Sequence, residues 1–183
     1  MKYKETFYFI SKCLTISFEE KNRQEIEKLL QLKTISWETV VEVSTTHYIF
    51  PALYCNFKRV GFLHYLPQEL VNFMEHITNL NRERNEQIIT QAKDLNTLLL
   101  KNNITPMFLK GTGNLLEGLY VDIGERMVGD IDFLVLEKDL QSANEILKSD
   151  GYSTPENLLN HFPGHRHFPR LIKQKKHCSS RNS

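Results

Sequence analysis

Two acidic residues, Asp130 and Asp132, lie at the start of an apolar run, Phe133 to Leu136. Successive side chains of a β-strand point to opposite faces, so we expect both carboxylates on one face, about 7 Å apart along the strand. The apolar run is typical of a strand buried on both faces. Two neighbouring carboxylates repel each other, and a bound cation relieves that repulsion. Their hard oxygen atoms favour Mg²⁺ or Mn²⁺ as that cation.

The same pair has a simpler interpretation, as a turn acid followed by a solvated residue at a sheet edge. Residues upstream favour the metal site. Met107-Phe108-Leu109 predicts a short strand, and Lys110-Gly111-Thr112-Gly113 predicts a turn into a helix that begins near Asn114. Backbone N–H groups at a helix N-terminus, together with an ammonium and a hydroxyl, can bind phosphate. This order of elements indicates nucleotidyl transfer: a strand, a phosphate-binding turn, a helix, and then a strand that begins with Asp-x-Asp.

These residues also resemble a known family, a largely uncharacterised bacterial family of nucleotidyltransferases in the polymerase-beta-like superfamily. The resemblance is carried by Phe108-Leu109-Lys110-Gly111, Leu119-Tyr120, Arg126, Gly129-Asp130-Ile131-Asp132-Phe133-Leu134-Val135 and Gly151-Tyr152. It is strongest from Pro106 to Tyr152 and extends loosely back to about Trp37. Most of the superfamily has a Gly-Ser pair where Lys110-Gly111 stands here.

The resemblance implies an α/β (α+β) fold, in which a minimal nucleotidyltransferase core with a mixed sheet follows a helical N-terminal region. The implied reaction transfers a nucleoside monophosphate from an NTP to an unknown acceptor, either a protein or a small molecule. From the sequence itself we expect no membrane partner, and nucleic acid is not indicated. Asp130 and Asp132 are the implied catalytic residues and ligands of Mg²⁺ (or Mn²⁺). The implied nucleotide-binding residues are Lys110, Gly111, Thr112 and Arg126.

Enzymes of the superfamily use a third carboxylate on a later strand. In this sequence no Asp or Glu follows Glu156, which itself follows a proline. Either the third ligand comes from elsewhere, or the chain is a truncated, weakly active or inactive member. The alternative function is a non-catalytic NTP-binding or protein-interaction module with a degenerate nucleotidyltransferase fold.

Several of these residues have competing interpretations. Arg126 either contacts a triphosphate or forms a surface ion pair with Glu125 or Asp122, and Lys110 is either a phosphate ligand or an ordinary loop lysine. Three histidines, His161, His165 and His167, could form part of a zinc site, although no Cys or acid lies nearby in sequence to complete it. The resemblance favours a structural or substrate-contacting role for them.

Composition narrows the class of protein. With 183 residues, 40% hydrophobic residues, 25% charged residues and a net charge of +1, the chain resembles a soluble globular protein and favours no particular partner. The three cysteines show no CxxC spacing, which fits a reducing compartment. We find no signal peptide, membrane-spanning run, Walker A sequence or GxGxxG motif, and we expect a cytoplasmic protein.

The order of elements predicts three regions. Residues 1–103 form a helical N-terminal region, residues 104–174 an incomplete nucleotidyltransferase core, and residues 175–183 a disordered basic tail. The longest helix is predicted to run from about Gln68, after Pro67, to Lys101. Its polar stretch, Asn79 to Glu86, is interpreted as a solvated face in preference to a functional one. A further helix is predicted from Glu137 to Ser149, with Gly151 as its C-terminal cap.

The basic string from Lys175 to Ser183 leads to a testable expectation, namely that the reading frame has shifted near Lys175. One chosen set of codons that would encode this string is AAA AAA CAC TGC AGC AGT AGA AAT TCA. Read from the second base, they encode Lys-Asn-Thr-Ala-Ala-Val-Glu-Ile, a strand pattern with one acid. Sequencing the gene checks this expectation, which is wrong if the other frame encodes no acid-bearing strand followed by further open frame.

Overall fold

The longest helix is α5 (Gln68–Lys101), with the bounds that its apolar pattern predicts. The computed structural model describes residues 3–155 and 170–173. Before α5 lie α1 (Tyr3–Cys13), α2 (Glu20–Gln31), α3 (Trp37–Thr46), α4 (Phe50–Arg59) and the 3₁₀ helix η1 (Phe62–Tyr65). After it lie β1 (Met107–Phe108), α6 (Lys110–Leu116), β2 (Phe133–Leu134), η2 (Glu137–Asp139), α7 (Leu140–Ser149), β3 (Tyr152–Ser153) and β4 (Ile172–Lys173). This is the predicted α+β fold with a helical N-terminal region.

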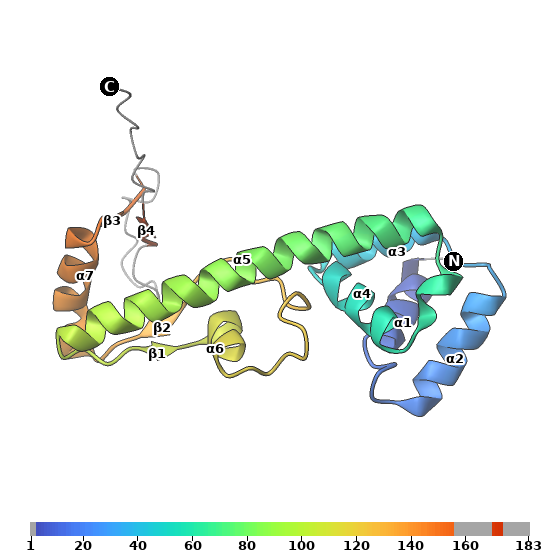
Figure 1. The fold of residues 1–183 in the computed structure, drawn as a ribbon, viewed down its shortest axis with the longest axis horizontal. Coiled ribbons are helices and arrows are strands. Elements are labelled where there is room, and N and C mark those ends of the chain that lie inside the picture. The colour runs from blue at the N-terminus through green and yellow to red at the C-terminus, as the bar shows by residue number, and fades with distance from the viewer. Residues whose placement is uncertain (1–2, 156–169, 174–183) are drawn as a thin grey trace, which may run out of the picture. The chain divides into compact units, whose positions relative to one another are not determined.

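The chain divides into two compact units. The first combines the residues up to Leu95 with Met107–Phe133, and the second combines Asn96–Pro106 with the residues from Leu134 onward. In the first unit, α1 to α4, coloured blue to teal, gather around the N-terminal part of α5 (Figure 1). Phe50, Leu53 and Phe57 of α4 and Met74 of α5 are each at most 1% exposed. Their removal from water is the main stabilising contribution in this helical cluster.

A second, smaller apolar cluster lies further along α5 and positions the candidate site. Ile88 of α5, Leu115 of α6 and Val128 are buried against one another, and Ile131 packs against them. Because Val128 and Ile131 immediately precede and follow Gly129 and Asp130, this cluster fixes the chain on both sides of the first aspartate.

The strands are shorter and more exposed than predicted. β2 covers only Phe133–Leu134, and the side chains of Leu134 and Leu136 are 54% and 64% exposed. The prediction of a strand buried on both faces is therefore wrong. β1 and β2 form a two-stranded sheet, and residues two apart share one face of a strand. The exposure of Leu134 and Leu136 means that no described element covers their face.

The second unit contains η2, α7 and the antiparallel pair β3–β4, in which Tyr152 pairs with Lys173. The helix predicted from Glu137 is thus divided into a 3₁₀ turn and α7. Gly151, which follows the C-cap of α7, has φ +92°, the conformation in which glycine commonly ends a helix. The three histidines and the predicted tail lie outside the described residues, and the sequence-based domain boundaries stay predictions. No helix among the described residues is long and apolar enough to cross a membrane.

Gly113, in the middle of α6, is expected to be intolerant of substitution. A Cβ at this position would lie 2.9 Å from the backbone oxygen of Phe108, and backbone cannot yield as a flexible side chain does. We therefore predict that Gly113→Ala lowers the free energy of unfolding by about 1–3 kcal/mol, although Ala normally favours a helix. Urea denaturation measures the change. Gly129→Ala is the control, because a Cβ there meets nothing within 4 Å. Equal effects of the two substitutions would contradict the prediction.

Candidate functional site

Lys110 lies at the turn where β1 leads into α6, in an unusual backbone conformation. Its φ is +51°, in the left-handed region that non-glycine residues rarely occupy. α6 begins at Lys110, which is earlier than the predicted start near Asn114. Such strain persists only where surrounding contacts impose it, and it is frequent in ligand-binding sites. The side chain extends to Asp132, with 2.9 Å between Nζ and the carboxylate Oδ2.

Backbone contacts tie this turn to the segment that carries the two aspartates. The N–H of Leu109 donates to the carbonyl of Asp132 at 2.9 Å, and the hydroxyl of Thr112 donates to the carbonyl of Asp130 at 2.9 Å. Thr112 is only 1% exposed, so its hydroxyl holds the main chain of Asp130 in this structure. At Gly111 an added Cβ would lie 2.9 Å from the side chain of Val128. The turn and the aspartate segment are therefore packed together without space between them.

The structure brings Lys110, Asp130 and Asp132 into one electrostatic group. The hydrogen bond to Asp132, the charge of Asp132 and the charge of Asp130 together raise the pKa of Lys110, which keeps its ammonium protonated. Both aspartates precede β2 instead of lying within it. Asp130 is exposed, and the side chain of Asp132 is 26% exposed.

Two accessible carboxylates suit Mg²⁺, which is commonly bound through one or two carboxylates plus substrate phosphates. The cation already beside Asp132, the ammonium of Lys110, shows that positive charge is stabilised there. Among residues 3–155 and 170–173, no group of three or more His, Cys, Asp or Glu side chains could hold a metal ion.

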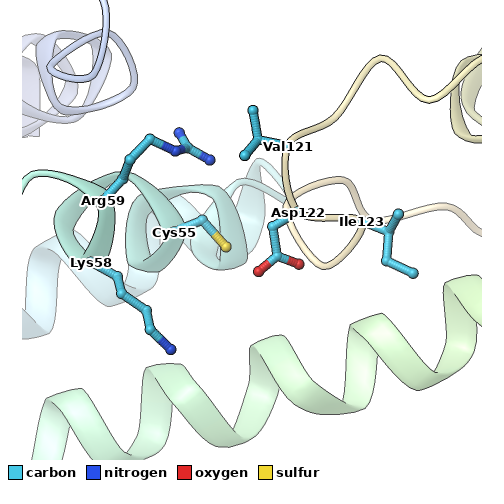
Figure 2. A pocket seen from close by; sticks show the side chains of 6 residues that line it. All are labelled: Cys55, Lys58, Arg59, Val121, Asp122 and Ile123. Atoms are coloured by element: carbon cyan, nitrogen blue, oxygen red, sulfur yellow. The ribbon is translucent and has the colours of Figure 1, made fainter.

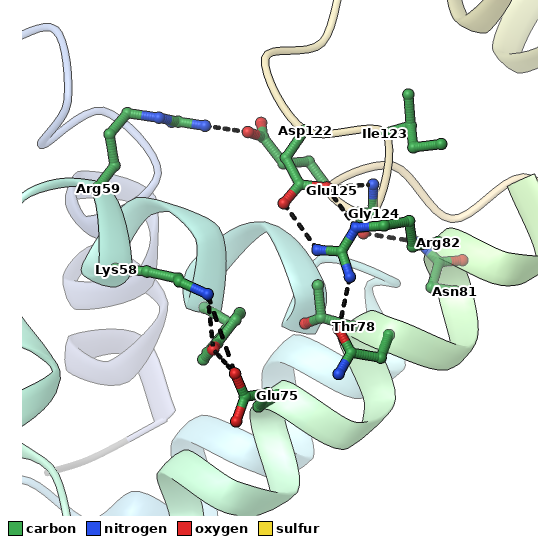
Figure 3. Close-up of polar contacts among 12 residues, drawn as sticks. Lys58, Arg59, Glu75, Thr78, Asn81, Arg82, Asp122, Ile123, Gly124 and Glu125 are labelled. Carbon is green, nitrogen blue, oxygen red and sulfur yellow. Dashed lines mark hydrogen bonds and ion pairs between the residues drawn. The ribbon is translucent and has the colours of Figure 1, made fainter.

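Arg126 is exposed, and both of its candidate ion-pair partners are bound elsewhere. Glu125 pairs with Arg59 of α4, and Asp122 pairs with Arg82 of α5, as Figure 3 shows. The second contact is double, with Nε to Oδ1 at 3.0 Å and an Nη to Oδ2 at 2.7 Å. The hydrogen bond from Arg82 lowers the pKa of Asp122. Within the described part of the chain, no ion pair or side-chain hydrogen bond engages the guanidinium of Arg126, so the surface ion pair considered from sequence is wrong.

Sequence reasoning missed two buried asparagines. Asn81 and Asn85 lie one helical turn apart on α5, at 5% and 0% exposure. The Asn81 amide donates to the carbonyls of Gly124 and Arg126 at 2.8 and 3.0 Å, and the Asn85 amide donates to those of Ile123 and Arg126 at 2.5 and 2.7 Å. The interpretation of this stretch as a solvated face is wrong for both residues. The i, i+4 spacing of two asparagines was the available signal.

A pocket of about 440 Å³ lies in the first unit, where α4 faces the loop before Asp130, residues 120–129 (Figure 2). It is lined by Cys55, Lys58, Arg59, Val121, Asp122 and Ile123. Burial raises the pKa of the Cys55 thiol to about 12, so this thiol stays protonated and is a poor nucleophile. The pocket contains none of the site residues predicted from sequence.

Comparison with known proteins adds one decisive observation. A family model described as an uncharacterised nucleotidyltransferase matches residues 33–179. The chain belongs to this nucleotidyltransferase family. A search of curated proteins and a search of solved structures each gave no match.

The family match includes the turn at Lys110 and the charged residues around it. The matched region contains all the predicted site residues, as well as the arginines of α4 and α5 that bind the loop before Asp130. The left-handed φ at Lys110 is a conformation that glycine adopts without strain. Lysine adopts this conformation with strain, and its side chain places an ammonium beside Asp132.

We predict that Lys110→Gly raises the melting temperature of the ligand-free protein by a few degrees. Glycine relieves the left-handed strain, and an exposed ion pair contributes little to stability. Lys110→Ala is the matched control, because it removes the same ion pair and keeps the strain. Thermal unfolding of the two variants beside the wild type checks the prediction. A glycine variant that is no more stable than the alanine variant would contradict it.

Proposed function

We propose that this protein transfers a nucleoside monophosphate from an NTP to an acceptor, which is a protein or a small molecule. The observation that carries the proposal is the charge group at the β1–α6 turn, where the ammonium of Lys110 lies 2.9 Å from Asp132. A turn that concentrates one cation and two carboxylates can bind both a polyphosphate and its counter-ion. Family membership supports the reaction class.

In this proposal Asp130 and Asp132 hold Mg²⁺ (or Mn²⁺), which supplies positive charge to the phosphate oxygens when bound. Lys110, which pairs with Asp132 in this structure, would contact the phosphates with its ammonium when nucleotide is bound. The contacts of Leu109 and Thr112 with the backbone of the aspartate segment keep the two carboxylates in place. Such positioning is the protein's main contribution to phosphoryl-type transfer.

The exposed guanidinium of Arg126 is the second proposed triphosphate ligand. A guanidinium presents its donors in a planar fork that matches phosphate oxygens. Gly111 follows Lys110 in the first turn of α6, and its backbone is the third proposed phosphate contact. The sequence argument for a reducing compartment extends the proposal to a cytoplasmic location, and free, buried Cys13 and Cys55 agree with it.

A specific observation supports the alternative, a non-catalytic NTP-binding module. In the described part of the chain, Asp132 and Asp130 are the two acids whose charges act on Lys110, and the wider superfamily uses three carboxylates. Calorimetry with ATP or GTP and Mg²⁺ tests binding, and release of pyrophosphate from the same mixture with candidate acceptors tests transfer. Binding with transfer supports the enzyme, binding without transfer supports the module, and an absence of binding to any NTP contradicts both.

We predict that Asp130→Asn and Asp132→Asn each abolish Mg²⁺-dependent nucleotide binding and change the melting temperature little. Removing one of two neighbouring carboxylates relieves their repulsion, and the lost ion pair of Asp132 is partly exposed. Calorimetry and thermal unfolding measure the two effects. Asp94→Asn, an exposed acid of α5, is the control and should bind nucleotide normally. A clear loss of stability with binding intact would show that Asp130 and Asp132 are structural acids.

A further inference from the structure

The loop before Asp130 contains one arginine, Arg126, and two acids close to it in sequence, Asp122 and Glu125. In the folded chain each acid is bound by an arginine from a different helix (Figure 3). Arg59 reaches Glu125 from α4, and Arg82 binds both carboxylate oxygens of Asp122 from α5. The loop's own arginine is left without a carboxylate partner among the described residues.

The backbone of Arg126 is fixed at the same time. Its carbonyl accepts hydrogen bonds from Asn85 at 2.7 Å and Asn81 at 3.0 Å. Gly124 also packs closely against α5, because an added Cβ there would lie 3.1 Å from the backbone oxygen of Thr78. The peptide that bears Arg126 is therefore held against α5, and its guanidinium is exposed.

An unbound carboxylate beside Arg126 would compete with a phosphate. At 4 Å the attraction between two unit charges is about 1 kcal/mol in water and about 4 kcal/mol near a protein surface. A carboxylate attached to the same loop is always present, whereas a nucleotide must be recruited from solution. Binding of Glu125 and Asp122 by other arginines removes this competition.

We propose that Arg59 and Arg82 are positioning residues for nucleotide binding, which bind Glu125 and Asp122 and so keep Arg126 available for the triphosphate. This inference rests on the proposed function. It makes the helices of the N-terminal region part of the nucleotide site, although neither arginine contacts the nucleotide itself.

Glu125 gives the sharper test, because Asp122 has an additional contact: it also accepts from the N–H of Gly124 at 2.8 Å. In Arg59→Gln the carboxylate of Glu125 is released and can pair with Arg126. We expect Mg²⁺–ATP affinity to fall by about tenfold, which corresponds to about 1.4 kcal/mol. In Glu125→Gln no carboxylate is released, so affinity stays at the wild-type value or rises.

The double variant Arg59→Gln/Glu125→Gln is expected to regain the affinity that Arg59→Gln loses. An ion pair that served only the fold would behave differently, because removing either partner would weaken binding and the double variant would not recover it. Lys12→Gln is the control, since it breaks a different ion pair, between Lys12 of α1 and Glu25 of α2. It should leave ATP affinity unchanged.

Calorimetry with Mg²⁺–ATP and thermal unfolding of every variant separate the outcomes. If the wild type binds no nucleotide, the proposed function fails and this inference fails with it. If the wild type binds and Arg59→Gln binds equally well, only the inference is overturned. If Arg59→Gln does not fold, Glu125→Gln decides alone: weakened binding overturns the inference, and unchanged or stronger binding supports it.

Discussion

The hydrogen bonds from Asn81 and Asn85 to the loop before Asp130 are the contact on which the site depends. The segment from Tyr120 to Ile131 contains no helix or strand, so its carbonyl groups find no partners in a regular ladder. A buried carbonyl without a partner costs about 1–3 kcal/mol. The two amides satisfy three such carbonyls from the middle of α5. The oxygen of the Asn85 side chain is buried without a hydrogen bond, so its two donated bonds must outweigh that cost.

This arrangement explains why α5 is long. Its N-terminal part contributes Met74 to the core of the helical cluster, its middle holds the loop, and Ile88 then packs against α6 and the residue before Gly129. One rigid element therefore fixes both flanks of the aspartate segment. The helical N-terminal region contributes to the same loop through Arg59. The helices of the first unit and the charge group at the β1–α6 turn form one structural module.

Sequence alone was sufficient for the bounds of α5, for the helical N-terminal region and for the nucleotidyltransferase family. The bounds of α5 follow from Pro67 and from a long apolar stripe, and family resemblance located the residues around Asp130. The burial of the strand was predicted wrongly. The apolar run from Phe133 to Leu136 indicates a strand, but the sequence does not show whether other elements pack on its two faces. The two asparagines were missed for a related reason. Polar residues in mid-helix are usually solvated, and only the loop they bind, about 40 residues later, reveals their burial.

The position of Cys55 beside the loop has a practical consequence. The thiol is 5% exposed and lines the same pocket as Asp122, so we expect a thiol-specific reagent to reach it faster when the loop moves away from α4. Cys13, with 0% exposure in the core of the helical cluster, is an internal reference for opening of that core. The difference between their labelling rates separates loop opening from global unfolding. The labelling rate of Cys55 in the native chain therefore reports how often the segment that contains Arg126 moves.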